Sequence, residues 1–371
     1  MLKKLKRKRI FNQMSDEGFR EARVLGGNPS GILNFNDTNH SWATEIYLKM
    51  KDRTWFSSQV DISKDIVNYQ KLTKAKKRSY DLVLAQLIAD DSIQTNQLAD
   101  RINPYITSPI INACIITQDM EEVNHSYSYA VMAEDIAKDT DRIYEMAKHD
   151  SELAKKNLAV ENMYETLSTP YANNILKKAW YKIKHEVMHI EYNPTKKDML
   201  LACAANQILE ELVFPGGFVV IHSLEHDLPG SSSMIAEIQK DETLSHVELF
   251  KRIFRQIITE DFYNKVPSDI KERIYAVIKN MTEAEKRWTK YVSKGLEGFS
   301  EATIDIFIEG KANSVCKNLL LEPLYAKQEY DPLNKLLVSH LKGGNGNLKS
   351  KTNFFERNVA DYGNDVIEYD I

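Results

Sequence analysis

The chain has 371 residues, 43% of them hydrophobic, which is enough for one large domain or two ordinary ones with a sizeable buried core. A formal net charge of −4 provides no general attraction to nucleic acid or to anionic membrane, so we expect neither as a partner. The three cysteines are widely separated and include no Cys-x-x-Cys pair. This argues against a disulfide framework or a zinc knuckle and predicts a reducing, cytoplasmic compartment.

The N-terminus is basic at residues 3–9, but no apolar stretch follows, so it does not match a secretory signal. No later stretch has the pattern expected of a membrane span. We expect residues 1–24 to be a mobile segment, followed by a glycine-rich turn cluster at residues 26–31. The predicted folded domain covers residues 25–341.

The predicted fold class is all-α. Glycine (14) and proline (10) are scarce, and good helix formers recur in long runs without turn residues. Capping residues at 61–65 begin a helical pattern that continues to about residue 100. Further helical stretches are predicted at residues 109–137, 139–169, 172–190, 196–226, 231–259, 268–295 and 299–320.

The clearest functional pattern is a stripe within residues 109–137. Its members recur at steps of three and four residues and therefore share one helix face: Ile115, Gln118, Glu122, His125, Tyr129 and Met132. One Glu-x-x-His pair is weak evidence for a metal site, because acids and histidines meet at this spacing by chance. Tyr129 lies one turn beyond His125, where it is either beside metal ions or simply packed in the core.

Three other helical stretches each carry an acid on an apolar stripe, namely Asp91, Glu210 and Glu242. Several unpaired carboxylates in one core are costly unless cations accompany them, and two metal ions would meet that need. A carboxylate from each of two helices, with a Glu/His pair from each of two others, is the ligand set of di-iron and di-manganese carboxylate bundles. The pattern predicts a ferritin-like four-helix bundle with additional helices.

Two features depart from a regular ligand pattern. Glu242 and His246 are four residues apart instead of three, so metal binding by both predicts a widened, π-helical turn between them. Pro215 cannot donate a hydrogen bond to the carbonyl of Glu211, which predicts a kinked or loosened helix beside Glu210. A loosened backbone would let the Glu210 carboxylate shift between binding modes, and a kink that serves packing alone is the alternative.

The last residues, 342–371, are predicted to form a flexible tail. A Gly/Asn-rich linker leads into the cluster Asn353-Phe354-Phe355-Glu356 and then into an acidic, partly apolar end. Aromatic residues beyond a linker are typical of a segment that docks on a partner, and a disordered remnant is the alternative.

Taken in order, these motifs resemble the small subunit of class I ribonucleotide reductase over about residues 25–362. The resemblance is carried by Trp55, Val60-Asp61-Ile62-Ser63-Lys64-Asp65, Asp91-Ser92-Ile93-Gln94, Glu122-x-x-His125-Ser126-x-x-Tyr129, Leu209-Glu210 with Phe214 and Phe218, Ile238, Asp241-Glu242, and Lys351-Thr352-Asn353-Phe354-Phe355-Glu356 with Tyr362.

The resemblance implies a role for each of these residues. Two iron ions per chain, or manganese ions, would be bound by Asp91, Glu122, His125, Glu210, Glu242 and His246. Tyr129 would hold a stable radical, shielded by Phe214, Phe218 and Ile238. Trp55, Asp241 and Tyr362 would relay the oxidising equivalent to a large catalytic subunit, and the family also implies a homodimer.

Two other functions use similar ligands. A di-metal oxidase or oxygenase acting on a small molecule without a partner subunit would leave Trp55, Tyr129 and the tail segment Asn353 to Glu356 without a role. For ferritin-like iron storage the chain is longer than necessary and has an unsuitable tail, and a cage-sized assembly would identify that function. The sequence contains no P-loop and no Gly-x-Gly-x-x-Gly, which agrees with nucleotide reduction on a separate subunit.

Overall fold

The computed structural model describes residues 4–15, 17, 22–33, 35, 39–168, 180, 183 and 193–341. Within these residues the regular structure is helical, and the only β pairing is two isolated bridges, Lys4 with Thr195 and Leu25 with Ile106. The all-α prediction is therefore confirmed for the part of the chain that the structure describes.

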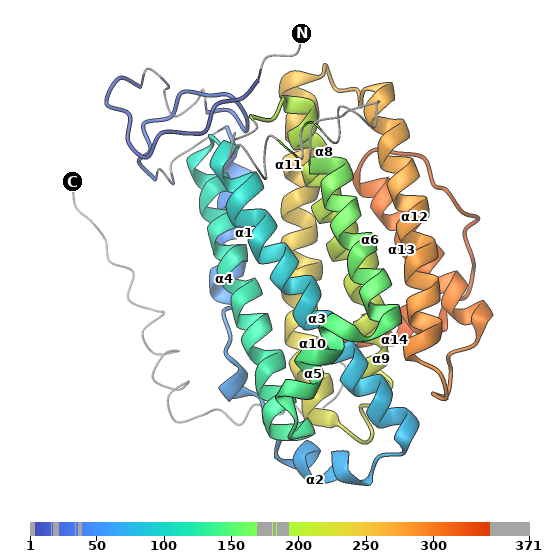
Figure 1. Ribbon diagram of the computed structural model, residues 1–371. Coiled ribbons are helices and arrows are strands. Elements are labelled where there is room, and N and C mark those ends of the chain that lie inside the picture. The colour runs from blue at the N-terminus through green and yellow to red at the C-terminus, as the bar shows by residue number, and fades with distance from the viewer. Residues whose placement is uncertain are drawn as a thin grey trace.

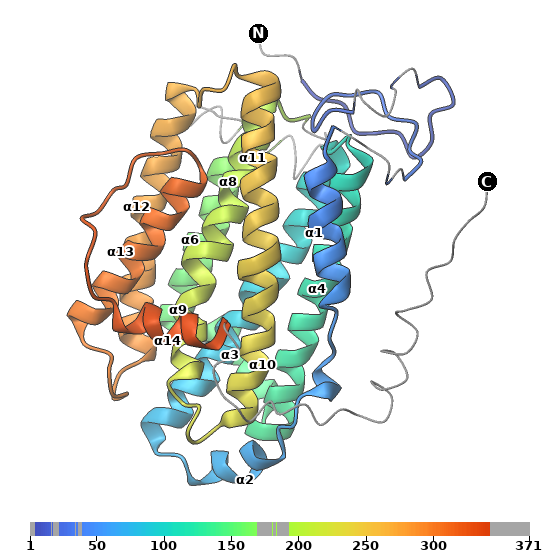
Figure 2. The same cartoon turned by 180° about the vertical axis from the view of Figure 1, so that it is seen from behind.

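Helical rods that pack side by side form the centre of the molecule (Figures 1 and 2), and the helix bounds and contacts define four of them. Two of them are single α-helices, α3 and α4, and the other two are each built from a pair, α8 with α9 and α10 with α11. Their bounds are α3 Lys74–Gln97, α4 Pro109–Val131, α8 Lys196–Ile208, α9 Phe214–His222, α10 Pro229–Asp241 and α11 Val247–Asp261. This arrangement confirms the predicted four-helix bundle.

Additional helices pack around the bundle. Helices α6 and α12 lie against α8, α13 packs on α12, and α1 lies along α4 (Figure 2). Their bounds are α1 Ser41–Asp52, α2 Ser63–Lys71, α5 Thr140–His149, α6 Ser151–Ser168, α12 Ser268–Val292, α13 Glu301–Asn318 and α14 Pro332–Leu341, with short 3-10 turns at Ser57–Gln59 and Asn103–Tyr105. The prediction did not include α1 or α14.

A π-helical turn, in which the backbone hydrogen bonds span five residues instead of four, follows α3 and α4 and joins α8 to α9 and α10 to α11. Among the described residues these turns are Leu98–Ile102, Met132–Ala137, Leu209–Val213 and Glu242–His246. The turn at Leu209–Val213 comes just before Pro215, where the sequence predicts a loosened helix. The turn at Glu242–His246 is the widened turn expected from the four-residue spacing of the Glu/His pair.

Two predicted helices are each divided by a capping residue. The stretch predicted from 61 to about 100 breaks at Thr73, whose hydroxyl accepts a hydrogen bond from the Lys76 amide and starts α3. The stretch predicted at 139–169 breaks at Asp150, whose carboxylate accepts from the amides of Glu152 and Leu153 and starts α6. The predicted helix at 172–190 lies outside the described residues except for Trp180 and Ile183, which are helical.

One stretch of the bundle, Lys196–His222, is long and apolar enough to cross a membrane by length and composition. The expectation that no stretch has this pattern is therefore wrong. Its most apolar window is 94% buried inside the protein, which marks it as a core helix. All three cysteines are buried and free, in agreement with the absence of a disulfide framework.

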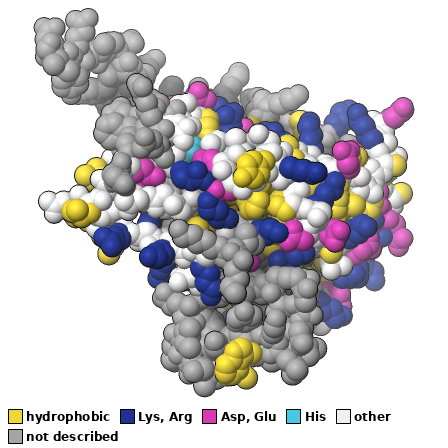
Figure 3. All heavy atoms as spheres, turned by 90° about the horizontal axis from the view of Figure 1, so that it is seen from above, with side chains coloured by type: hydrophobic (Ala, Val, Ile, Leu, Met, Phe, Trp, Pro, Cys, Tyr) yellow, Lys and Arg dark blue, Asp and Glu magenta, His cyan; other side chains and the backbone are white. Residues whose placement is uncertain are grey.

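Positive and negative side chains are interspersed on the end of the molecule in Figure 3.

Candidate metal centre

Two groups of metal-ligating side chains lie at the centre of the bundle. One contains Asp91, Glu122 and His125, and the other contains Glu122, Glu210, Glu242 and His246. Within each group one ligand atom from every residue lies within 4.8 Å of the others, and all these side chains are buried. Glu122 belongs to both groups, so the two groups are adjacent. The six residues predicted as ligands are thus brought together.

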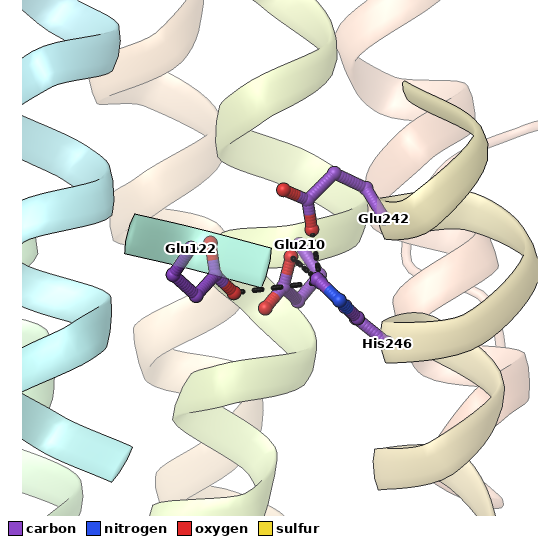
Figure 4. Close-up of side chains that lie close together, drawn as sticks. All are labelled: Glu122, Glu210, Glu242 and His246. Atoms are coloured by element: carbon purple, nitrogen blue, oxygen red, sulfur yellow. Dashed lines mark hydrogen bonds and ion pairs between the residues drawn. The ribbon is translucent and has the colours of Figure 1, made fainter. Parts of the chain in front are cut away.

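The helices place these side chains from four directions. Asp91 comes from α3, and Glu122 and His125 come from α4. Glu210, Glu242 and His246 come from the two π-helical turns, and Figure 4 shows them gathered beside Glu122. In a π-helical turn the rotation per residue is smaller than in an α-helix, so residues four apart stay in line. His246 Nδ1 consequently lies 2.7 Å from Glu242 Oε2, across the turn.

The distances show how tightly the two groups are connected. His125 Nδ1 lies 3.1 Å from Glu242 Oε1 and 3.5 Å from Glu122 Oε2. His246 Nδ1 lies 3.4 Å from Glu122 Oε1. Both histidines therefore face the same two glutamates, which is the arrangement needed for carboxylates that bridge two ions.

The donor set fits metal ions. Several buried ligand atoms have no hydrogen-bond partner among the described residues: both carboxylate oxygens of Asp91, Oε2 of Glu122, Nδ1 of His125, Oε2 of Glu210 and Oε1 of Glu242. Buried polar atoms are nearly always paired, so unpaired atoms that converge on one place need an ion there. Oxygen and imidazole donors suit iron and manganese alike.

The pKa values of the carboxyl groups show the same crowding. Burial, and then the nearby negative charge of Glu122, raises the pKa of Asp91 well above its usual range. Burial, and then the charge of Glu242, does the same to Glu210. Like charges held in a core repel each other, and bound cations relieve that repulsion.

The outer nitrogen of each histidine is held by a carboxylate. His125 Nε2 lies 3.2 Å from Asp241 Oδ2, and His246 Nε2 lies 2.8 Å from Glu121 Oε2. Such partners orient a metal-ligating imidazole and fix which nitrogen faces the ion. The sequence analysis did not identify Glu121 as a partner of His246. Its position next to the predicted ligand Glu122, on the same helix, could have marked it as a candidate.

Trp55 is joined to this centre through Asp241. Its indole nitrogen donates a hydrogen bond of 2.7 Å to Asp241 Oδ2, the oxygen that also contacts His125. The rings of Trp55 and His125 are nearly parallel, with centroids 6.3 Å apart. A continuous set of contacts therefore runs from Trp55 through Asp241 to His125, whose other ring nitrogen faces the candidate ligand carboxylates.

Tyr129 is fully buried on the ligand-bearing face of α4, whereas Tyr127 is exposed. The Tyr129 hydroxyl has no hydrogen-bond partner among the described residues. Burial, and then the negative charge of Asp91, raises the pKa of Tyr129 well above its usual range. The phenol is therefore neutral and lies within the field of the ligand carboxylates.

The structure describes the predicted shield of Tyr129 but not the predicted relay residue in the tail. Phe214, Phe218 and Ile238 are buried, and the two phenylalanine rings are stacked with centroids 5.9 Å apart. Tyr362 lies outside the described residues. The sequence analysis gave no role to the amides of Gln94 and Gln118, which donate hydrogen bonds to the ligand carboxylates.

Comparisons with known proteins agree with this arrangement. The family model described as "Ribonucleotide reductase, small chain" matches residues 32–332. The chain is 29% identical over 366 residues to the ribonucleoside-diphosphate reductase subunit beta of Treponema pallidum (strain Nichols), covering 96% of this chain and 95% of that protein.

Solved structures share the fold. The ribonucleotide reductase R2 subunit from Clostridium botulinum superposes with a TM-score of 0.78 at 22% identity, covering 91% of this chain and 99% of that one. The dimanganese(II)-NrdF of Streptococcus sanguinis superposes with a TM-score of 0.66 at 18% identity, covering 84% and 99%. Because the family match extends over most of the chain and includes every helix that carries a candidate ligand, this chain belongs to the ribonucleotide reductase small-chain family.

Proposed function

We propose that this chain, as the beta subunit of a ribonucleoside-diphosphate reductase, binds two metal ions and holds a radical at Tyr129. The ligands would be the six side chains of the two adjacent groups. The observation that carries the proposal is that Glu122 belongs to both groups, because a shared carboxylate is what a two-metal site requires. The four carboxylates also balance the charge of two divalent ions.

Iron is the proposed metal, with manganese as the alternative. The ligand types suit both ions, and the family resemblance favours iron. The Streptococcus sanguinis protein, which shares the fold, is described as a dimanganese form. When bound, the two ions would act together with oxygen as the oxidant that removes one electron from Tyr129.

The surroundings of Tyr129 suit a long-lived radical. Its side chain is fully buried, so water and dissolved reductants have no contact with the ring. The stacked pair Phe214 and Phe218, with Ile238, would supply the apolar shield that the resemblance implies. The Tyr129 hydroxyl has no hydrogen-bond partner among the described residues, so none of these side chains is placed to return a hydrogen atom to the oxidised phenol.

The oxidising equivalent would leave through Asp241 and Trp55. The contacts from His125 to Asp241 and from Asp241 to Trp55 support this route. Tyr362 in the tail would continue it to the large subunit, where ribonucleotides are reduced to deoxyribonucleotides. A di-metal oxidase without a partner subunit would have no use for the connection to Trp55.

We also propose that two copies of the chain pair through an apolar face of α4. Ile116, Met120, Val123 and Tyr127 recur at helical spacing and are 49%, 44%, 56% and 62% exposed. They form one stripe on the side of α4 that does not carry the ligands. An exposed apolar stripe of this kind marks an interface, and we call it the α4 stripe.

Electron paramagnetic resonance tests the radical assignment. Metal-loaded protein exposed to oxygen should show a tyrosyl signal and contain two metal ions per chain by elemental analysis. Tyr129→Phe should keep the metals and lose the signal, because phenylalanine is far harder to oxidise. Glu122→Ala should lose both the metals and the signal. A tyrosyl signal of normal size in Tyr129→Phe would place the radical elsewhere.

A further inference from the structure

The carboxylate of Glu210 is held by two amide groups from neighbouring helices. Gln94 Nε2 on α3 donates a hydrogen bond of 2.5 Å to Glu210 Oε1, and Gln118 Nε2 on α4 donates one of 2.9 Å to the same oxygen. All three side chains are buried. Glu210 itself lies on the π-helical turn Leu209–Val213, which interrupts the regular helix between α8 and α9.

Tyr164 fixes the direction of one of these amides. Its hydroxyl, on α6, donates a hydrogen bond of 2.6 Å to the carbonyl oxygen of Gln94. A glutamine amide has one accepting end and one donating end, so a donor on the carbonyl turns the NH2 group toward Glu210. Without that hydroxyl the amide could rotate and present its oxygen to the carboxylate.

Gln118 holds a second ligand in the same way. Its Nε2 also donates to Glu122 Oε1, over 3.1 Å. In Glu122 and Glu210 alike, the amides occupy Oε1, while Oε2 has no partner among the described residues. Each of these carboxylates therefore keeps one oxygen free and has the other engaged.

This support is confined to one of the two ligand groups. Gln94 and Gln118 contact Glu210 and Glu122, and no amide reaches Asp91, both of whose oxygens lack a partner among the described residues. Glu122 is shared, but Glu210 belongs only to the group that contains His246. Any effect of the two glutamines should therefore be larger at the position beside His246 than at the position beside His125.

We propose that Gln94 and Gln118, with Tyr164 orienting Gln94, are positioning residues that hold Glu210 for the metal position beside His246 and set the affinity of that position. The inference rests on the proposed two-metal function. Glu210 lies where the helix departs from regular α geometry, and the two amides restrain its carboxylate. Removing a partner that orients a metal ligand commonly weakens binding by 10–100-fold.

Manganese titration of metal-free protein provides the test, with unbound Mn²⁺ measured from its solution resonance signal. Gln94→Met and Gln118→Met keep the length of the side chain and remove the amide. Gln94→Met should weaken one of the two bound equivalents about tenfold and leave the other within about twofold. Gln118→Met, which also releases Glu122, should weaken the same equivalent about tenfold and the other by a smaller factor. Tyr164→Phe, which removes a single oxygen, should weaken the same equivalent by a smaller factor.

Gln239→Met is the matched control, because Gln239 is a buried glutamine whose amide bonds His222 and the Leu337 carbonyl, away from the ligands. It should leave both equivalents unchanged. Anomalous diffraction at the manganese edge from Tyr164→Phe or Gln94→Met crystals should show reduced occupancy beside His246. Equal weakening of both equivalents, unchanged binding, or lost occupancy beside His125 would overturn the proposal. Wild-type protein that binds fewer than two ions would instead reject the two-metal function.

Discussion

Lys156 shows how a single side chain can balance charge behind the metal centre. It is the one buried lysine or arginine among the described residues, and its Nζ lies 2.7 Å from Asp90 Oδ2 and 3.4 Å from Glu285 Oε1. Asp90 precedes the candidate ligand Asp91 in the sequence, so this ion cluster lies directly behind the candidate site. A buried charge needs a partner, and here one cation serves two acids.

Glu285 makes the stability of the protein depend on pH. Burial raises the pKa of Glu285 to about 8, from an ordinary value of 4.5. Between these values the folded chain holds a proton that the unfolded chain has lost, so stability falls as pH rises from about 4.5 to about 8. The slope from this group reaches about 1.4 kcal/mol per pH unit.

We therefore expect Glu285→Gln, which mimics the protonated acid, to reduce the loss of stability between pH 5 and pH 8. The variant should unfold at a higher temperature than wild type at pH 8 and at a similar temperature at pH 5. Calorimetry of both proteins at matched metal content measures this difference. If the unfolding temperatures of the variant and of wild type changed in parallel from pH 5 to pH 8, Glu285 would already be ionised at pH 5.

At the scale of elements, α14 is fastened to the bundle through a pair of histidines. The rings of His222 on α9 and His340 on α14 are stacked with centroids 3.7 Å apart, and Gln239 donates a hydrogen bond to the Leu337 carbonyl of α14. Figure 2 shows α14 lying across the bundle helices. Because α14 ends at Leu341, this attachment fixes the point from which the tail begins.

Acid should weaken this attachment. Burial, and then the neighbouring His340, lowers the pKa of His222 to about 3, from 6.5. The folded chain keeps His222 neutral while the unfolded chain binds a proton, so stability falls as pH drops from about 6.5 toward 3. His222→Phe keeps an aromatic ring but cannot bind a proton. The variant should unfold at a lower temperature than wild type at pH 7, because two hydrogen bonds are lost. Between pH 7 and pH 5 its unfolding temperature should fall less than that of wild type.

Amide hydrogen exchange of α14 adds a local measurement to the same comparison. Exchange in residues 332–341 should speed up more on acidification in wild type than in His222→Phe. An identical acid response in the two proteins would mean that other groups, such as the Glu225 carboxylate 3.4 Å from His340 Nε2, control the attachment.

At the scale of the whole molecule, the α4 stripe should control assembly. Val123→Lys places a charge at the centre of the stripe, where burial against a second copy would cost several kcal/mol. We expect sedimentation of wild type as a dimer and of Val123→Lys as a monomer or a weaker dimer. Val67→Lys on α2 is the matched control, because Val67 is also 56% exposed. A dimer of unchanged affinity in Val123→Lys would move the interface to another face.

The tail, whose residues 342–371 lie outside the described structure, should separate binding from radical transfer. Deleting residues 364–371 should weaken association with the large subunit and leave the Tyr129 signal intact. Tyr362→Phe should keep association and the signal but stop nucleotide reduction, because the relay needs an oxidisable side chain. Tyr369→Phe is the control, and it should remain active. Full turnover in Tyr362→Phe would transfer the relay role to Tyr369.

The sequence by itself determined the helical class and the faces that carry the candidate ligands. A helix repeats every 3.6 residues, so local spacing decides which side chains share a face, and Asp91, Glu122 and Glu210 could be placed inward from their apolar neighbours. The spacing of Glu242 and His246 likewise indicated a widened turn before any tertiary contact was known. Break points such as Thr73 were not predicted, because a capping residue competes only weakly with a continuing apolar pattern.

Only the tertiary structure decided which side chains meet. Glu122 faces His246, Glu121 holds the other nitrogen of His246, and Lys156 pairs with Glu285, although these partners come from helices far apart in the sequence. Periodicity fixes the direction of a side chain on its own helix but says nothing about the helix opposite. That information comes from how the rods pack, since burial leaves each polar group to be satisfied by whatever neighbour the packing supplies.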